Sequence, residues 1–229
     1  MDDKRMSEYR AMLRHVKKCL VGYTHTFGTK ASIRYSRFDH TKRVVTWTMR
    51  LIGKQGGLTI EEQDILITAA IFHDSGYVLC EDTSRHAEKS AEIAREYLTG
   101  QGWSSDKVNR VCELVAAHSD KARMRNPDIP RMLLMLMEAD LFDDSGAMGI
   151  IMDTRIEQAR NPQCDFKDAL QHIEKYTLRY ARRLSPMVTP AARAMWDEKS
   201  RMVESFYQSL KADLAYMIDE EEGEEDAEG

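Results

Sequence analysis

The stretch ILITAAIFHDSGY, residues 65–77, decides the fold of this 229-residue chain. Its first eight residues are apolar on nearly every side, and a capping-box pattern begins upstream at Thr59. A helix that is apolar all round belongs in a protein interior. The pattern therefore predicts a buried helix that begins at Thr59, ends at Phe72, and leads directly into His73 and Asp74.

Apolar residues at intervals of three and four predict helices along the rest of the chain. Gly and Pro are scarce, and unbranched helix-forming residues are plentiful. No segment has the pattern of a strand, so we expect an all-α globule with a single domain over residues 1–218, its core at 36–150 and C-terminal helices at 151–218. Helices are expected over residues 6–20, 36–52, 84–98 with Ser84 as N-cap, 105–118, 131–140, 153–160, 165–184 and 189–217.

The composition, with 42% apolar and 31% charged residues, is ordinary for a soluble globular protein. No apolar run approaches the roughly 18 residues that a membrane-spanning helix needs, and the charged start MDDKRMSEYR lacks the apolar core of a secretory signal. We expect a cytoplasmic protein with reduced thiols, because the cysteines have no paired spacing. They are Cys19, Cys80, Cys112 and Cys164.

The formal net charge of −5 is concentrated at one end of the chain. Residues 219–229, DEEEGEEDAEG, hold eight of the 38 acidic residues, which leaves 30 against 33 basic residues elsewhere. A block of like charges cannot bury itself, so we interpret it as a disordered tail. The remainder shows no basic stripe of the kind that binds nucleic acid, and we expect no nucleic-acid partner.

The positions of the histidines and of two aspartates are the main indication of a functional site. Two aspartates, Asp74 and Asp140, end the two most hydrophobic predicted helices, where an unpartnered carboxylate would be costly to bury. We find no Lys or Arg on those inner faces at helical spacing and therefore expect a divalent cation among these groups. Four of the seven histidines lie on, or at the end of, an apolar helical face: His40, His73, His86 and His118.

Imidazole and carboxylate ligands favour one or two ions of Mn, Fe, Co, Ni or Zn, because the set is too rich in nitrogen for Mg²⁺ or Ca²⁺. Taken singly, a histidine on an apolar face is more often a core residue, and only the joint pattern favours a metal. We interpret His15, His25 and His172 as surface or local-packing residues. A cluster of methionines is interpreted as core packing: Met132, Met135 and Met137.

The order His40, His73-Asp74, Asp140 resembles the HD superfamily of metal-dependent phosphohydrolases, in particular its small predicted bacterial members. The resemblance covers residues 36–214 and is most specific between His40 and Gly149. Glu138 departs from the usual Asp, and Leu141 replaces a common Arg. The similar segments are FDHTKRV (38–44), AAIFHDSGY (69–77), RHAEKSAEIAREYL (85–98), VAAHS (115–119) and EADLFDDSGAMGI (138–150).

The resemblance implies a phosphohydrolase that cleaves a phosphoester or phosphoanhydride, most simply of a nucleotide, with metal-activated water. His40, His73, Asp74 and Asp140 would bind the metal, with Asp74 also acting as the proton acceptor. His86 and His118 would hold a second metal or contact the phosphate as catalytic groups. Weaker candidates for phosphate binding, for which surface solvation is an equal alternative, are Lys42, Arg43 and Arg85.

Two other functions fit the same six ligands. The mixed-valent di-iron oxygenases of the HD fold use His, His-Asp, His, His and Asp to hold two irons. They generally place more chain before the last aspartate than the 22 positions by which Asp140 follows His118. The other alternative is a non-catalytic module in which the metal stabilises the fold or helps to sense a nucleotide.

Overall fold

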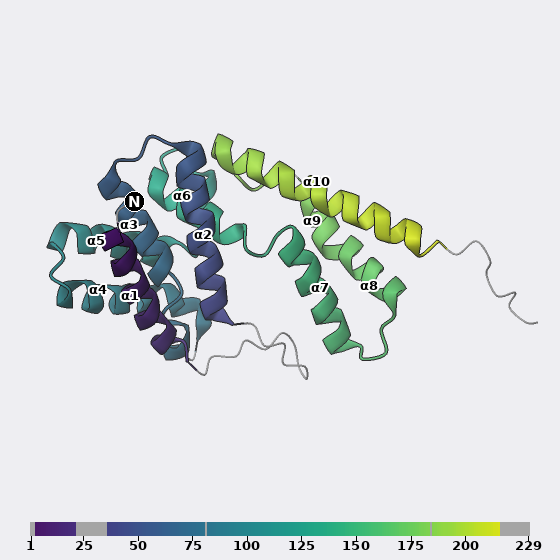
Figure 1. The fold of residues 1–229 in the computed structure, drawn as a ribbon, viewed down its shortest axis with the longest axis horizontal. Coiled ribbons are helices and arrows are strands. Elements are labelled where there is room, and N and C mark those ends of the chain that lie inside the picture. The colour runs from purple at the N-terminus through teal and green to yellow at the C-terminus, as the bar shows by residue number, and fades with distance from the viewer. Residues whose placement is uncertain (1–2, 22–35, 81, 184, 216–229) are drawn as a thin grey trace, which may run out of the picture.

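The computed structural model describes residues 3–21, 36–80, 82–183 and 185–215, and all regular structure in these ranges is helical (Figure 1). The expected all-α fold is confirmed. No helix in the described part of the chain has both the length and the apolar character needed to cross a membrane. The α-helices are α1 (Asp3–Cys19), α2 (Arg37–Gln55), α3 (Ile60–Phe72), α4 (His86–Gly100), α5 (Ser105–Ala117), α6 (Arg131–Leu141), α7 (Ala147–Arg160), α8 (Phe166–Ile173), α9 (Arg179–Arg182) and α10 (Pro190–Asp213).

Helix α3 lies at the centre of the first half of the molecule. Thr59 caps it with the predicted capping box, its side chain accepting from the Glu62 backbone while the Glu62 carboxylate accepts from the Thr59 backbone. Every residue from Asp64 to Phe72 is buried. Helices α1, α2, α5 and α6 pack around it, so the end of α3 opens into the interior of what we call the N-terminal bundle, α1–α6.

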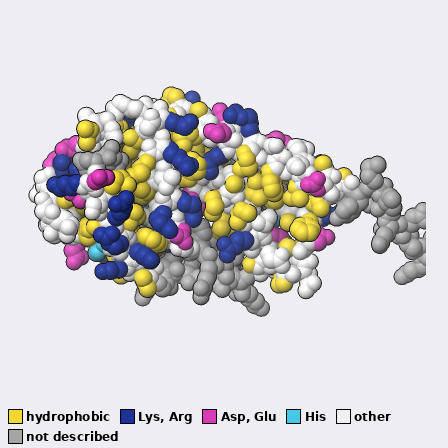
Figure 2. Space-filling model, viewed as in Figure 1, with side chains coloured by type: hydrophobic (Ala, Val, Ile, Leu, Met, Phe, Trp, Pro, Cys, Tyr) yellow, Lys and Arg dark blue, Asp and Glu magenta, His cyan; other side chains and the backbone are white. Residues whose placement is uncertain are grey.

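A second group of helices, the C-terminal layer α7–α10, extends from one side of this bundle (Figure 1). Its own apolar cluster contains only five buried residues: Ile150, Ile173, Leu178, Val203 and Tyr207. Exposed apolar side chains of the layer include Ile151, Phe166 and Phe206, and Figure 2 shows hydrophobic side chains gathered over that part of the molecule.

Helix α10 joins the two groups, because it runs along both of them (Figure 1). Its first half packs Met195 and Trp196 into the large apolar cluster of the bundle, while Val203 and Tyr207 belong to the small cluster. The buried Glu138 carboxylate of α6 fixes the start of this helix. It accepts hydrogen bonds from the Val188 and Thr189 backbone N–H groups and from the Thr189 hydroxyl, each at 2.7 Å.

Three helix boundaries differ from the sequence-based predictions. Ser84 is not the N-cap of α4; it lies inside the 3₁₀ turn Thr83–Arg85, and its backbone N–H donates to Asp82. Helix α7 begins at Ala147 instead of residue 153, because Gly146 takes the positive φ of 68° from which the helix can start. Helix α10 ends at Asp213 instead of residue 217. The acidic tail and His25 lie outside the described residues.

The predicted helix over 165–184 is interrupted by a π-helical segment, η4 (Glu174–Leu178), between α8 and α9. The backbone N–H and hydroxyl of Thr177 both donate to the Asp153 carboxylate of α7. Because the N–H is diverted to a neighbouring helix, it leaves the regular α-helical ladder and the turn widens. Sequence periodicity does not reveal such a diversion.

Candidate metal centre

Five helix termini bring the six predicted metal ligands together. His40 lies in the first turn of α2, and His73 and Asp74 directly follow α3. His86 opens α4, and His118 directly follows α5. Asp140, in the last turn of α6, completes the group.

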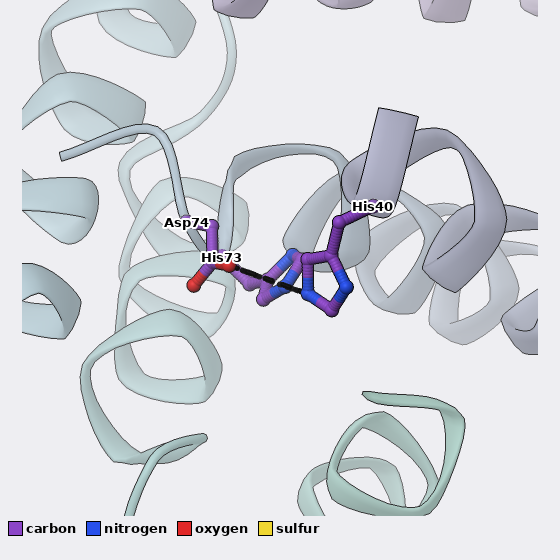
Figure 3. Close-up of side chains that lie close together, drawn as sticks. All are labelled: His40, His73 and Asp74. Carbon is purple, nitrogen blue, oxygen red and sulfur yellow. Dashed lines mark hydrogen bonds and ion pairs between the residues drawn. The ribbon is translucent and has the colours of Figure 1, made fainter. Parts of the chain in front are cut away.

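The first half of the site contains His40, His73, Asp74 and Asp140 (Figure 3, which draws the first three). The Nε2 atoms of His40 and His73 lie 3.2 Å apart. Oδ2 of Asp74 is 3.3 Å from Nε2 of His40 and 3.4 Å from Nε2 of His73. Oδ1 of Asp140 lies 3.1 and 3.8 Å from the same two nitrogens. These four side chains therefore surround one small volume.

The second half contains His86 and His118, whose Nε2 atoms are 3.3 Å apart. The other oxygen of Asp74, Oδ1, lies 3.4 Å from Nε2 of His86 and 3.5 Å from Nε2 of His118. Asp74 consequently faces one pair of histidines with each of its oxygens. It is the only one of the six ligands whose side chain is shared between the two halves in this way.

The Nδ1 atom of each imidazole, on the side of the ring away from the site, takes part in a hydrogen bond. Backbone carbonyl oxygens three residues earlier lie 2.7–2.8 Å from Nδ1 of His73, His86 and His118. A carbonyl oxygen can only accept, so each of these Nδ1 atoms carries a proton and donates it. In a neutral ring the Nε2 atom then presents its lone pair to the site. Nδ1 of His40 is 2.7 Å from the carboxylate of Asp143.

This arrangement fits divalent metal ions. Imidazole nitrogens 3.2 and 3.3 Å apart, with lone pairs facing one another, repel unless a proton or a metal ion lies between them. The side chains are almost fully buried, with only the Asp140 side chain 20% exposed. His40, His73, Asp74 and Asp140 could hold one ion, and Asp74, His86 and His118 a second.

The electrostatics of the metal-free site also favour a cation. Burial alone would raise the pKa of Asp74, but His73, His118 and His40 hold it well below its usual range. Burial would lower the pKa of His40, yet Asp140, Asp143 and Asp74 raise it well above the ordinary value. In the absence of metal, His40 therefore keeps a proton that an incoming ion would replace.

Comparisons with known proteins agree with this geometry. Residues 37–144, which contain all six ligands, match the HD domain family. The chain therefore contains an HD domain, and the expected resemblance to the HD superfamily is confirmed. No curated protein matches the chain by sequence.

Solved structures similar to this HD protein span nearly its whole length. YpgQ from Bacillus subtilis is 20% identical with a TM-score of 0.60, covering 92% of this chain and 97% of that one. YpgQ has also been crystallised in complex with ADP, with a TM-score of 0.62. A predicted HD superfamily hydrolase from an uncultured Thermotogales bacterium is 20% identical, with a TM-score of 0.61 and coverage of 93% and 99%. At these identities the likeness concerns the fold.

Two cations approach the carboxylates of the HD site, which corrects the expectation that no Lys or Arg shares these faces. Nη1 of Arg37 lies 3.0 Å from Oδ2 of Asp74. Nζ of Lys121 lies 2.7 Å from Oδ2 of Asp140 and supplies a cation near Leu141, the position where the superfamily commonly has Arg. Arg37 precedes His40 by three residues, so helical spacing on α2 could have revealed it.

The predicted phosphate-binding residues each contact an acidic neighbour. Lys42 lies 2.6 Å from Asp39, with half of its side chain exposed. Arg85 pairs with Glu88 on the surface. Arg43 donates two hydrogen bonds to the Asp143 carboxylate, from Nε at 2.5 Å and from Nη2 at 2.9 Å. The same carboxylate contacts Nδ1 of His40. Their roles toward a substrate stay predictions. Asp143 itself was missed, although it follows Asp140 by one helical turn.

The contact between Gly76 and α4 fixes the distance between the two halves of the HD site. The Gly76 backbone N–H donates to the Ser90 hydroxyl at 2.9 Å, and a Cβ at residue 76 would lie 2.5 Å from the Ser90 backbone nitrogen. Tyr77 then stacks on His86, with ring centroids 4.2 Å apart. Only glycine allows this approach, which keeps His86 beside Asp74.

Proposed function

We propose that the protein is a metal-dependent phosphohydrolase that cleaves a phosphoester or phosphoanhydride of a small phosphorylated molecule, most simply a nucleotide. One observation carries the proposal. Four imidazole Nε2 atoms and two carboxylates face a common buried volume, and the Nδ1 atoms behind them are already occupied. Such a ligand set has no structural use without a cation.

In this proposal His40, His73, Asp74 and Asp140 hold one ion, and His86 and His118 share Asp74 to hold a second. Bound divalent ions acidify water toward neutral pH and polarise a phosphoryl oxygen. When a single ion is bound, Asp74 would hold it through one carboxylate oxygen and would accept the proton of the attacking water with the other.

Arg37 and Lys121 would bind the phosphoryl oxygens. Both side chains contact carboxylates that a metal would also engage, and both lie at the edge of the buried site. The Arg37 guanidinium also lies over the Tyr77 ring, 4.1 Å from its centroid, which limits the directions in which it can point. A fixed planar cation recognises phosphate oxygens in a bidentate manner.

A nucleotide as substrate is supported by the ADP complex of YpgQ, which shares the fold. We also keep the prediction of a cytoplasmic protein, with which four free thiols are consistent. The domain prediction, a single unit over residues 1–218, is kept as well, because α10 packs into both apolar clusters.

The proposal is tested by elemental analysis of freshly purified protein, followed by a phosphate-release screen with the metal that the analysis reports. We expect one to two equivalents of a transition metal and anaerobic release of phosphate from at least one nucleotide or phosphomonoester. Protein that retains the metal but hydrolyses nothing in a broad panel would favour the non-catalytic module.

A di-iron oxygenase is the second candidate, because all six ligands of that class converge here and Asp74 is shared between the two halves. Two equivalents of iron together with substrate-dependent oxygen uptake would favour it. Phosphate release without oxygen would exclude it as the main activity.

A further inference from the structure

A groove of about 480 Å³ lies in the C-terminal layer, outside the metal centre. One wall is the face of α7 formed by Gly149, Met152, Asp153 and Ile156. The opposite wall is η4 and α9. Gly149 allows the walls to approach, since a Cβ there would lie 3.2 Å from the Thr177 hydroxyl.

The second wall consists of residues from the π-helical segment η4 and from α9, which follows it. Lys175 and Tyr176 lie in η4, and Arg179, Tyr180 and Arg183 follow one turn and two turns later. The side chains of all five line the groove. Cations and aromatic rings therefore alternate along a single surface.

The cations of this wall differ from their neighbour Arg182. Arg182 is paired on the surface with Glu204 through two contacts of 2.7 and 2.9 Å. Within the part of the chain that the structure describes, Lys175, Arg179 and Arg183 have no ion pair with a carboxylate. Two acids, Asp144 and Asp153, also line the groove, and the Asp153 carboxylate accepts hydrogen bonds from the Thr177 backbone N–H and hydroxyl. Among the described residues the groove thus presents three cations that are in ion pairs with neither acid.

The groove begins beside the metal centre. Asp144, which lines it, has a carboxylate oxygen within 4.8 Å of ligand atoms of His40 and Asp143. Tyr180 lies near both Asp144 and Arg183: after burial, Asp144 is the next cause that raises its pKa, and Arg183 opposes the rise. Asp144 therefore lies at the end of the groove next to the metal centre, within electrostatic range of Tyr180.

We propose that this groove is an anion subsite that binds the negatively charged part of the substrate beyond the cleaved phosphoryl group. The proposal rests on the proposed function for the location of that group. Guanidinium groups recognise phosphate oxygens, and rings of tyrosine can stack on a planar base. From Gly149 to Ile156 helix α7 rises about 10 Å, enough for the rest of an organic diphosphate. The substrate class is thus an organic di- or polyphosphate.

The test is calorimetric binding of ADP to the metal-loaded, full-length protein and to the double variant Arg179→Glu/Arg183→Glu. We expect the double variant to weaken ADP binding by at least about tenfold, because each lost contact is a charge-assisted hydrogen bond. Arg182→Glu is the matched control, since Arg182 lies on the same helix as Arg179 but pairs with Glu204 of α10 and does not line the groove. It should change ADP affinity less than about twofold.

The double variant Arg179→Lys/Arg183→Lys separates charge from structure, since it keeps the charge and should retain most of the affinity. Metal content and far-ultraviolet circular dichroism of each variant verify folding. Failure of ADP to bind the wild type, or a loss in the double Glu variant no larger than in Arg182→Glu, would overturn the proposal. The calorimetry requires no turnover, so an absence of phosphate release would contradict the proposed function alone.

Discussion

The N-terminal bundle and the C-terminal layer of this HD protein differ in how much of each is buried and in how regular their helices are. The bundle buries α3 from Asp64 to Phe72 and collects metal ligands from five helix termini in one largely buried volume. The layer has five buried apolar residues, a π-helical interruption and a groove lined by exposed cations. The difference indicates that the reacting chemistry belongs to the bundle and the choice of substrate to the layer, since function resides in sites built on a fold.

The largest effect is expected for Asp74→Ala, which tests whether the reacting chemistry belongs to the bundle. The change removes the one ligand that faces both histidine pairs and the proposed proton acceptor, so we expect loss of bound metal and a fall in turnover of at least about 10³-fold. Elemental analysis and phosphate release measure the two effects. Asp106→Ala, on the exposed surface of α5, is the control. Metal retained in full by Asp74→Ala would contradict the shared-ligand assignment.

His118→Ala separates the two halves of the site. The first half keeps all its ligands, so we expect about one equivalent of metal to remain while turnover falls about 100-fold, as for the loss of a positioned catalytic group. Metal titration followed by kinetics with the retained ion checks this. Loss of all metal would show that the two halves do not bind independently.

Glu138→Ala tests the junction between bundle and layer. The buried carboxylate is the acceptor for two backbone N–H groups and one hydroxyl at the start of α10, and its removal leaves these donors unsatisfied. We expect the free energy of unfolding to fall by about 3 kcal/mol, with metal content unchanged. Urea denaturation measures the loss. Glu138→Gln, which keeps an acceptor, should lose less; equal losses would mean that packing and not hydrogen bonding holds the junction.

Lys199 gives the smallest expected effect, a pH dependence at the same junction. Its ammonium donates to the Phe142 and Ser145 carbonyls, and burial lowers its pKa from 10.5 to about 8, with Asp143 and Asp144 opposing the shift and Arg50 adding to it. Between these two pH values the unfolded chain binds more protons, so Lys199 makes stability rise with pH.

Lys199→Met removes this contribution. Urea midpoints of wild type and variant at pH 7.5 and pH 10, compared pairwise, isolate it from other titrations. The wild type should gain more stability, or lose less, than the variant as the pH rises. An identical pH dependence in both proteins would show that Lys199 titrates normally.

The sequence predicts the bundle better than the layer for physical reasons. His40, His73 and Asp140 lie on strongly apolar helices, and a polar group at such a position is visible by its contrast with its surroundings. These ligands are far apart in the sequence, but each can be recognised separately as a polar residue on, or at the end of, an apolar predicted helix. Buried ligands are thus the part of a site that periodicity finds most readily.

The partners of these ligands and the groove are less visible. Lys121 lies in a polar segment outside the ligand helices, where a cation has the same sequence pattern as ordinary surface, whereas Arg37 is separated from His40 by a helical spacing on α2. Arg179 and Arg183 are four residues apart and share a helix face, but the groove that they line also needs α7, to which η4 is joined by the hydrogen bond from the Thr177 backbone N–H to Asp153. That contact depends on tertiary structure, and local sequence does not contain it.

The carbonyl oxygens behind His73, His86 and His118 have a consequence for how the protein tolerates substitution. Each oxygen belongs to the main chain three residues earlier, so a four-residue segment of backbone orients each ring through its Nδ1 atom. Residues lining the approach to the centre can therefore vary while the three rings keep their direction. Substitution of the residues that line the approach could therefore change which substrate reaches the metal centre without disturbing its ligands. The same residues are the ones to change in a redesign of substrate preference.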